Sequence, residues 1–164
     1  MKRVASTTAL IWFVTLTSRA FAADEPTSNR KEDVIYGRKF GMALTMDVFT
    51  PRKDSNHRGV VFVVSGGWFS AHEAIARQFV EPLVKRGYTV FAVVHGSQPK
   101  FTIPEVLQDM NRAVRYIRFH AKDYEIDPDK LGITGASAGG HLSDRKSTRL
   151  NSSHLKLSRM PSSA

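Results

Sequence analysis

The pattern of apolar and polar residues predicts a hairpin followed by buried strands. Two short β-prone runs, 33–40 and 44–50, flank a glycine-containing turn at Gly41 and end at Pro51, which is typical of a β-hairpin. Residues 59–64 and 88–94 are unbroken apolar runs, as expected of strands that are buried on both faces of a largely parallel sheet. A shorter strand is predicted at 130–134.

Helical patterns separate these strands. Residues 71–86 carry apolar side chains at helical spacing, and Gly87 follows as a stop. A second helix is predicted over 104–121, where Pro104 suits the first turn, and a third opens after the last strand. The alternation of strand and helix predicts an α/β architecture with right-handed crossovers.

The first 22 residues differ from this pattern. Residues 1–3 contain two basic side chains, an apolar stretch follows, and Ala20-Phe21-Ala22 completes the arrangement of a secretory signal peptide. The apolar stretch is shorter than the roughly 20 residues that a membrane span needs, so an uncleaved anchor is the weaker alternative. We therefore expect a secreted or periplasmic protein that leaves the membrane once the signal is cleaved.

The last residues are also set apart. Residues 145–164 are rich in serine and base and contain no acid. We interpret this segment as a non-native or disordered tail. The domain organisation expected is thus a signal peptide over 1–22, a partial α/β domain over 23–144 and a tail over 145–164.

The net charge of +9 does not indicate a nucleic-acid partner. Most of the excess lies in the two terminal segments, whereas residues 23–144 hold 16 Lys or Arg against 15 Asp or Glu. Such mixed charges are typical of an ordinary solvated surface. There is no cysteine, hence no zinc-thiolate site or disulfide, and no His, Asp and Glu cluster has convincing metal spacing, so neither metal nor cofactor is expected.

One motif carries candidate chemistry. Gly135-Ala136-Ser137-Ala138-Gly139 matches the Gly-x-Ser-x-Gly nucleophile elbow, in which a strained turn between strand and helix presents a serine. Glycine is needed at Gly135 and Gly139 because a side chain there would collide with the neighbouring strand and helix. The motif follows a predicted strand and opens a predicted helix, so Ser137 is the candidate nucleophile.

A second glycine pair follows the strand at 59–64. In Ser65-Gly66-Gly67-Trp68, backbone N–H groups can come close to a substrate oxygen and stabilise an oxyanion. We expect Gly66, Gly67 and Trp68 to form the oxyanion hole together with the N–H of Ala138, which comes directly after the nucleophile. The alternative for Gly66 and Gly67 is a plain strand-to-helix turn.

These motifs together resemble an α/β-hydrolase of the acetylesterase and carboxylesterase branch, with a His-Gly-Gly-Gly type of oxyanion motif. The resemblance covers about residues 33–143 and is most specific at the elbow and at Asp127-Pro128-Asp129. Ser65 stands where many relatives have histidine. The resemblance implies a small-molecule ester substrate, an acyl-enzyme on Ser137, and a triad whose acid and histidine follow the serine.

No such acid and histidine are apparent here, so we expect an incomplete α/β-hydrolase sheet and an inactive, poorly stable fragment. His141 comes four residues after Ser137 and suggests a packing role, while His72 and His95 are candidates for lining the pocket. A prolyl-oligopeptidase-type peptidase and a non-catalytic binding protein are alternative functions on the same fold. Oligomeric state is left open.

Overall fold

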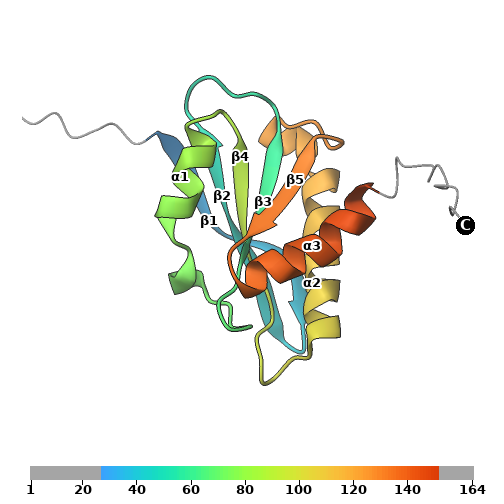
Figure 1. The fold of residues 1–164 in the computed structure, drawn as a ribbon. Helices are drawn as coiled ribbons and strands as arrows, with labels where there is room; N and C mark the ends of the chain where they lie inside the picture. Colours follow the sequence, from blue (N-terminus) through green and yellow to red (C-terminus); the bar gives the residue numbers. More distant parts are fainter. Residues whose placement is uncertain (1–26, 152–164) are drawn as a thin grey trace, which may run out of the picture.

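The computed structural model describes residues 27–151, with side chains described through Arg145. In this range the chain forms one five-stranded mixed sheet with helices on both faces (Figure 1). No helix among the described residues is long and apolar enough to cross a membrane. The predicted signal peptide and residues 152–164 lie outside the described residues.

The opening hairpin consists of β1 (Ser28–Lys39) and β2 (Met42–Pro51). Phe40 and Gly41 connect them with φ values of 44° and 77°, and this left-handed two-residue turn matches the twist of the paired strands. The strand β1 begins five residues earlier than the pattern predicts, because Asn29 to Lys31 pair with Val48 to Thr50. A bulge places Glu32 and Asp33 together opposite Asp47.

The strand order is β1-β2-β4-β3-β5, which completes the sheet with β3 (Gly59–Val64), β4 (Thr89–Val94) and β5 (Leu131–Gly135). Strand β2 pairs antiparallel with β4, whereas β3 runs parallel to both β4 and β5. The strands β3 and β4 are almost wholly buried, as their apolar runs predict. The strand β5 forms the edge of the described sheet, and each of its residues is partly or fully exposed.

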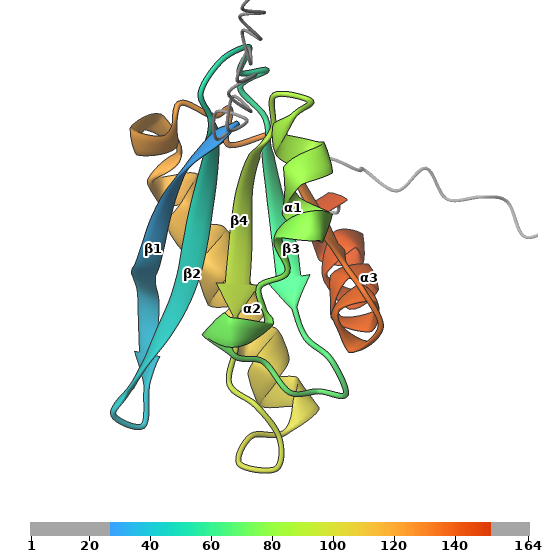
Figure 2. The same ribbon diagram turned by 90° about the vertical axis from the view of Figure 1, so that its left-hand side faces the viewer.

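Helices cover the two faces of the sheet unequally (Figure 2). The helix α1 (Arg77–Val84) packs Val80 and Val84 against one face. The helices α2 (Ile103–Phe119) and α3 (Ala138–Asn151) lie on the other face, where Met110, Ile117 and Leu142 join the larger apolar core. The predicted alternation of strands and helices is therefore confirmed.

The structure corrects one predicted helix. The segment expected to be helical over 71–86 is divided into a 3₁₀ turn, η1 (His72–Ala74), and α1, with Ile75 and Ala76 extended between them. The side chain of His72 lies near Asp33 and Asp47, and this contact fixes the chain before the helix begins. Apolar spacing cannot reveal such a contact, which joins residues far apart in the sequence.

Two other boundaries differ from the pattern. The helix predicted over 104–121 ends at Phe119, and the 3₁₀ turn η2 (Ala121–Tyr124) follows it. The helix α3 continues to Asn151, seven residues past the boundary placed at 144. That residues 145–164 are a non-native or disordered tail stays a prediction.

Candidate active site

The two predicted motifs meet at the carboxyl ends of the neighbouring strands β3 and β5. Because β3 and β5 are adjacent and parallel, with Val63 opposite Gly135, the segments that follow them leave the sheet side by side. The loop after β3 carries Gly66 to Trp68, and the turn after β5 carries Ser137. Ser137 is exposed to solvent, as a nucleophile must be.

The turn at Ser137 has the strain that a nucleophile elbow requires. Ser137 has a φ of 53°, a left-handed conformation that few residues other than glycine adopt. A Cβ added to Gly135 would lie 2.6 Å from the carbonyl carbon of Gly139, and one added to Gly139 would lie 2.5 Å from the carbonyl oxygen of Val63. Both glycines are thus required by sterics, because strand and helix backbones nearly touch at this point.

The helix α3 starts directly after the serine. Ala138 is its first residue and is buried, and the N–H of His141 donates to the carbonyl oxygen of Ser137 over 3.2 Å. Within residues 27–151, the N–H of Ala138 donates to no backbone acceptor. The first N–H groups of a helix have no partner inside the helix and favour an anion, which suits an oxyanion next to Ser137.

The loop after β3, which we call the donor loop (residues 65–70), forms a tight turn. Gly66 and Phe69 exchange N–H···O hydrogen bonds of 2.9 Å in both directions, and Gly67 and Trp68 between them have φ values of 55° and 67°. The N–H of Gly66 is therefore engaged inside the turn. In the described part of the chain, the N–H groups of Gly67 and Trp68 donate to no backbone acceptor, so these two are the donors that the loop offers.

Space is open in front of the donor loop. A Cβ added to Gly66 or Gly67 would meet no heavy atom within 4 Å. The loop also contacts the elbow region, since the ring of Trp68 lies edge-on to that of His141 with centroids 5.5 Å apart. His141 thus packs against the donor loop, in agreement with the packing role suggested by its place in the sequence.

The other histidine candidates lie away from Ser137. His72 is near Asp47 of β2, and β4 and β3 separate β2 from β5, a spacing of about 14 Å at about 4.8 Å per strand. His95 at the end of β4 is buried, its Nδ1 lies 2.6 Å from the carbonyl oxygen of Gly96, and burial lowers its pKa. No ring nitrogen of the histidines described in the structure hydrogen-bonds to the hydroxyl of Ser137, so none serves as its base there.

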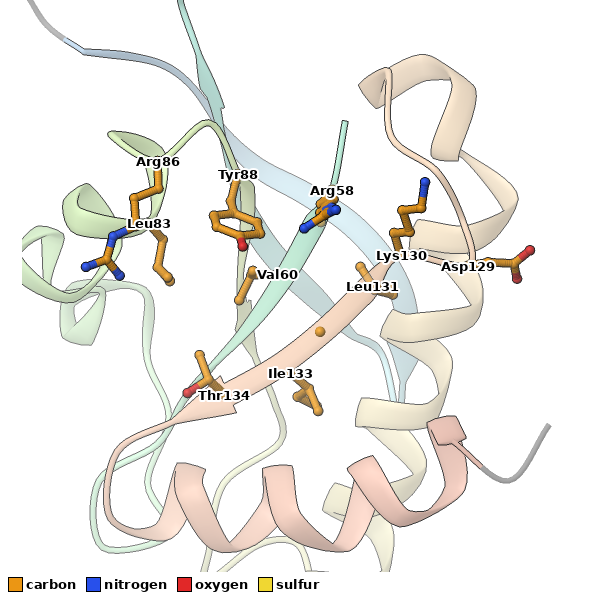
Figure 3. Close-up of a pocket in the computed structure, with 12 residues that line it drawn as sticks. Arg58, Val60, Leu83, Arg86, Tyr88, Asp129, Lys130, Leu131, Ile133 and Thr134 are labelled. Atoms are coloured by element: carbon orange, nitrogen blue, oxygen red, sulfur yellow. The ribbon is translucent and has the colours of Figure 1, made fainter. Parts of the chain in front are cut away.

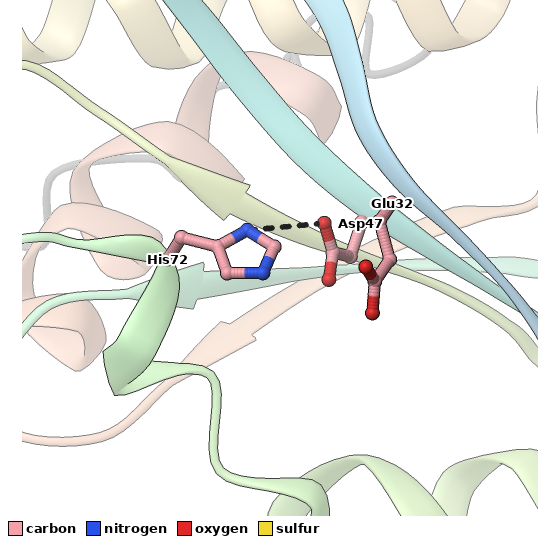
Figure 4. A group of neighbouring side chains, drawn as sticks. All are labelled: Glu32, Asp47 and His72. Atoms are coloured by element: carbon pink, nitrogen blue, oxygen red, sulfur yellow. Dashed lines mark ion pairs between the residues drawn. The ribbon is translucent and has the colours of Figure 1, made fainter.

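A cluster that sequence reasoning missed lies beside His72. Glu32 from β1, Asp47 from β2 and His72 from η1 bring potential metal-ligand atoms within 4.8 Å of one another (Figure 4). The guanidinium of Arg30 contacts all three, with its Nε 2.8 Å from Asp47 Oδ2 and its Nη1 3.0 Å from Glu32 Oε1. Because Arg30 already supplies the positive charge, we interpret the cluster as an ion-pair network.

Two hollows lie in different parts of the described sheet region. One of about 640 Å³ lies between the α1 side and the exposed part of β5 and is lined by Val60, Leu83, Tyr88 and Leu131, among others (Figure 3). Its lining begins at the amino ends of β3 and β5 and follows β5 as far as Thr134, three residues before Ser137. The other, of about 340 Å³, lies at the carboxyl edge and is lined by Ser70, His95, Ser97 and Phe101, among others, so it adjoins the donor loop.

Comparison with known proteins decides the family. The model of the BD-FAE family matches residues 46–161, which include the donor loop and the elbow. The chain belongs to the BD-FAE family of α/β-hydrolases. This membership confirms the resemblance to the acetylesterase and carboxylesterase branch that the motifs indicate.

Several relatives of this BD-FAE chain are ester hydrolases. It is 34% identical over 116 residues to the probable carboxylic ester hydrolase LipM of Mycobacterium tuberculosis, covering 68% of this chain and 26% of LipM. It is 36% identical over 124 residues to an acetylxylan esterase of Xylanibacter ruminicola, covering 68% of this chain and 24% of that enzyme. The chain thus spans about a quarter of the length of these relatives.

Solved structures agree with this assignment. A truncated carbohydrate esterase from gut microbiota superposes with a TM-score of 0.65 at 31% identity, covering 73% of this chain and 44% of that one. Esterase 2 of Thermogutta terrifontis superposes with a TM-score of 0.62 at 27% identity, covering 72% and 43%. The described sheet therefore corresponds to part of an α/β-hydrolase fold, as predicted.

Proposed function

We propose that the complete protein is a secreted serine esterase that hydrolyses small carboxylic esters through an acyl-enzyme on Ser137. The observation that carries the proposal is the strained, exposed elbow at Ser137, which adjoins a loop with two N–H groups free of backbone acceptors. Such donors can stabilise the negative charge that develops on a carbonyl oxygen during acyl transfer.

The reaction proceeds in two halves. Ser137 Oγ attacks the ester carbonyl carbon, the N–H groups of Gly67, Trp68 and Ala138 bind the resulting oxyanion, and the alcohol leaves with the serine proton. Water then attacks the acyl-enzyme, which releases the acid and restores the hydroxyl. A general base has to accept the serine proton, and we assign that base and its acidic partner to parts of the complete protein beyond the residues described here.

The names of relatives support an ester with a carbohydrate on the alcohol side. One relative is an acetylxylan esterase and one structural neighbour is a carbohydrate esterase. Esterase 2 of T. terrifontis, 26% identical in this comparison, is phosphorylated by paraoxon. Organophosphorus reagents are therefore suitable probes for the nucleophile of this chain as well.

The direct test replaces the nucleophile in the complete protein. Ser137→Ala is expected to lower kcat for p-nitrophenyl acetate and acetylated xylan by about 10³-fold or more, since loss of a triad serine removes the covalent route. Ser55→Ala, at an exposed loop serine before β3, is the matched control and should retain wild-type activity. Ester hydrolysis that persists in Ser137→Ala would contradict the proposal, and cleavage of dipeptide amides in preference to esters would favour the peptidase alternative.

A further inference from the structure

The donor loop has a conformation that needs external support. Trp68 is a bulky residue at a φ of 67°, and holding a residue other than glycine in this region costs about 1–3 kcal/mol. Such a conformation persists only where surrounding contacts determine it. The contacts that hold this loop therefore decide where the N–H groups of Gly67 and Trp68 point.

One hydroxyl group holds the base of the loop by bonding to both backbone groups of a single residue. Ser97, in the segment after β4, accepts a hydrogen bond of 2.8 Å from the N–H of Ser70 and donates one of 2.9 Å to the carbonyl oxygen of Ser70. The next residue along, Gln98, donates its N–H to the carbonyl oxygen of Trp68 over 3.3 Å. The segment after β4 is thus bonded directly to the donor loop.

The side chain of Ser70 extends this connection to two strands. Its buried hydroxyl donates to the carbonyl oxygen of Val64, the last residue of β3, over 2.5 Å, and accepts from the N–H of His95 over 3.1 Å. Ser70 is the last residue of the donor loop and follows the hydrogen-bonded turn over 66–69, and Ser97 lies outside the loop. Their hydroxyl groups join that turn to the ends of β3 and β4.

The far end of the loop is fixed by the Arg30 network. The carboxylate of Asp47 is 1% exposed, accepts from Arg30 and from the N–H of Asp33, and lies 3.5 Å from His72 Nδ1. His72 comes two residues after the donor loop, in the short turn η1. The chain that follows Gly67 and Trp68 is therefore held at two points, at Ser70 by the hydroxyl of Ser97 and at His72 by this network.

We propose that Ser97 is a positioning residue for catalysis, whose hydroxyl holds the donor loop so that the N–H groups of Gly67 and Trp68 meet the oxyanion. The inference rests on the proposed esterase function and assigns Ser97 no contact with substrate. A displaced donor weakens binding of the transition state more than binding of the ground state, because full negative charge develops only in the former. Loss of the Ser97 hydroxyl should therefore lower kcat and leave KM nearly unchanged.

The test compares Ser97→Ala with Ser97→Thr and Ser55→Ala in the complete protein. We expect Ser97→Ala to lower kcat by about 10–100-fold with KM within about threefold, a smaller loss than removal of an oxyanion donor causes. Ser97→Thr keeps the hydroxyl and should recover most of the rate, and Ser55→Ala should match wild type. A phenylboronic acid, which mimics the tetrahedral intermediate, should bind Ser97→Ala more weakly by a factor similar to the loss in kcat.

Several outcomes would overturn the inference. These are a kcat of Ser97→Ala within twofold of wild type, a rise in KM alone, or unchanged affinity for the boronic acid. If Ser97→Ala does not fold, Ser97→Cys retains the volume with weaker hydrogen bonds, and wild-type kcat in that variant counts against the proposal. Failure of the esterase function itself is distinguishable. It would show as wild-type protein that does not hydrolyse esters, or as ester hydrolysis that persists in Ser137→Ala.

Discussion

The centre of the sheet and its β5 edge differ in how they are stabilised. The strand β4 is paired on both sides, and five of its six residues are buried. Within the sheet that the structure describes, β5 is paired on one side only, and none of its residues is fully buried. The helix α1 packs its buried side chains against β3, β4 and β2, so the same face of β5 borders an open hollow.

The elbow nevertheless has its strained geometry at this less protected edge. Close approach of Gly135, Gly139 and Val63 defines the turn, and these contacts come from two adjacent strands and one helix. Local backbone sterics thus set the position of the nucleophile, whereas burial stabilises the central strands. The predictions that follow test this division, from the largest expected effect to the smallest.

The largest effect is expected at Gly139. Gly139→Ala would place a Cβ 2.5 Å from the carbonyl oxygen of Val63, so strand and helix must separate, and we expect a loss of about 2–3 kcal/mol in the free energy of unfolding. Gly66→Ala is the matched control, because its Cβ meets nothing within 4 Å, and should change stability by less than about 0.5 kcal/mol. Urea unfolding of both variants measures the difference, and equal stabilities would refute the steric account of the elbow.

Replacing one leucine in the core and one in β5 compares the stability of the two regions directly. Leu44 of β2 is 3% exposed within the larger core, whereas Leu131 of β5 is only partly buried. Leu44→Ala should lower the free energy of unfolding by about 2 kcal/mol, the lower end of the usual range for a buried leucine, and Leu131→Ala by about 1 kcal/mol. Should Leu131→Ala cost as much as Leu44→Ala, the edge strand would be as well stabilised as the centre.

The smallest effect concerns pH and His95. Burial lowers the pKa of His95 from its ordinary 6.5, while the nearby Asp109 raises it and Lys39 lowers it. The unfolded state therefore binds the proton more readily, so the contribution of neutral His95 to stability is complete above pH 6.5 and is lost as the pH falls below it. The drop in Tm between pH 7.5 and 5.5 should be smaller in His95→Gln than in wild type, and identical drops would contradict this assignment.

The features that sequence predicts well depend on short stretches of chain. The buried strands at 59–64 and 88–94 follow from unbroken apolar runs, and the elbow follows from a five-residue motif whose glycines have a steric reason. The Arg30, Asp47 and His72 network was not predicted, because a β-bulge and a loop bring together residues 17 to 42 positions apart. The same network divides the helix predicted over 71–86.

The donor loop shows a further limit. Its glycine pair indicates a place for backbone donors, but the sequence does not indicate that the N–H of Gly66 bonds to Phe69 while those of Gly67 and Trp68 stay available. It also gives no indication that Ser97 bonds to Ser70, because these residues lie in separate loops. Such choices depend on how two loops meet at the ends of adjacent strands.

The most direct test of the central claim is a crystal structure of the complete protein after reaction with a phosphonate ester. The account predicts a covalent bond from Ser137 Oγ to phosphorus, with the phosphonyl oxygen about 2.7–3.1 Å from the N–H nitrogen of Ala138 and from that of Gly67 or Trp68. A phosphonyl oxygen that points away from these amides, or a phosphonate attached to a different residue, would contradict it.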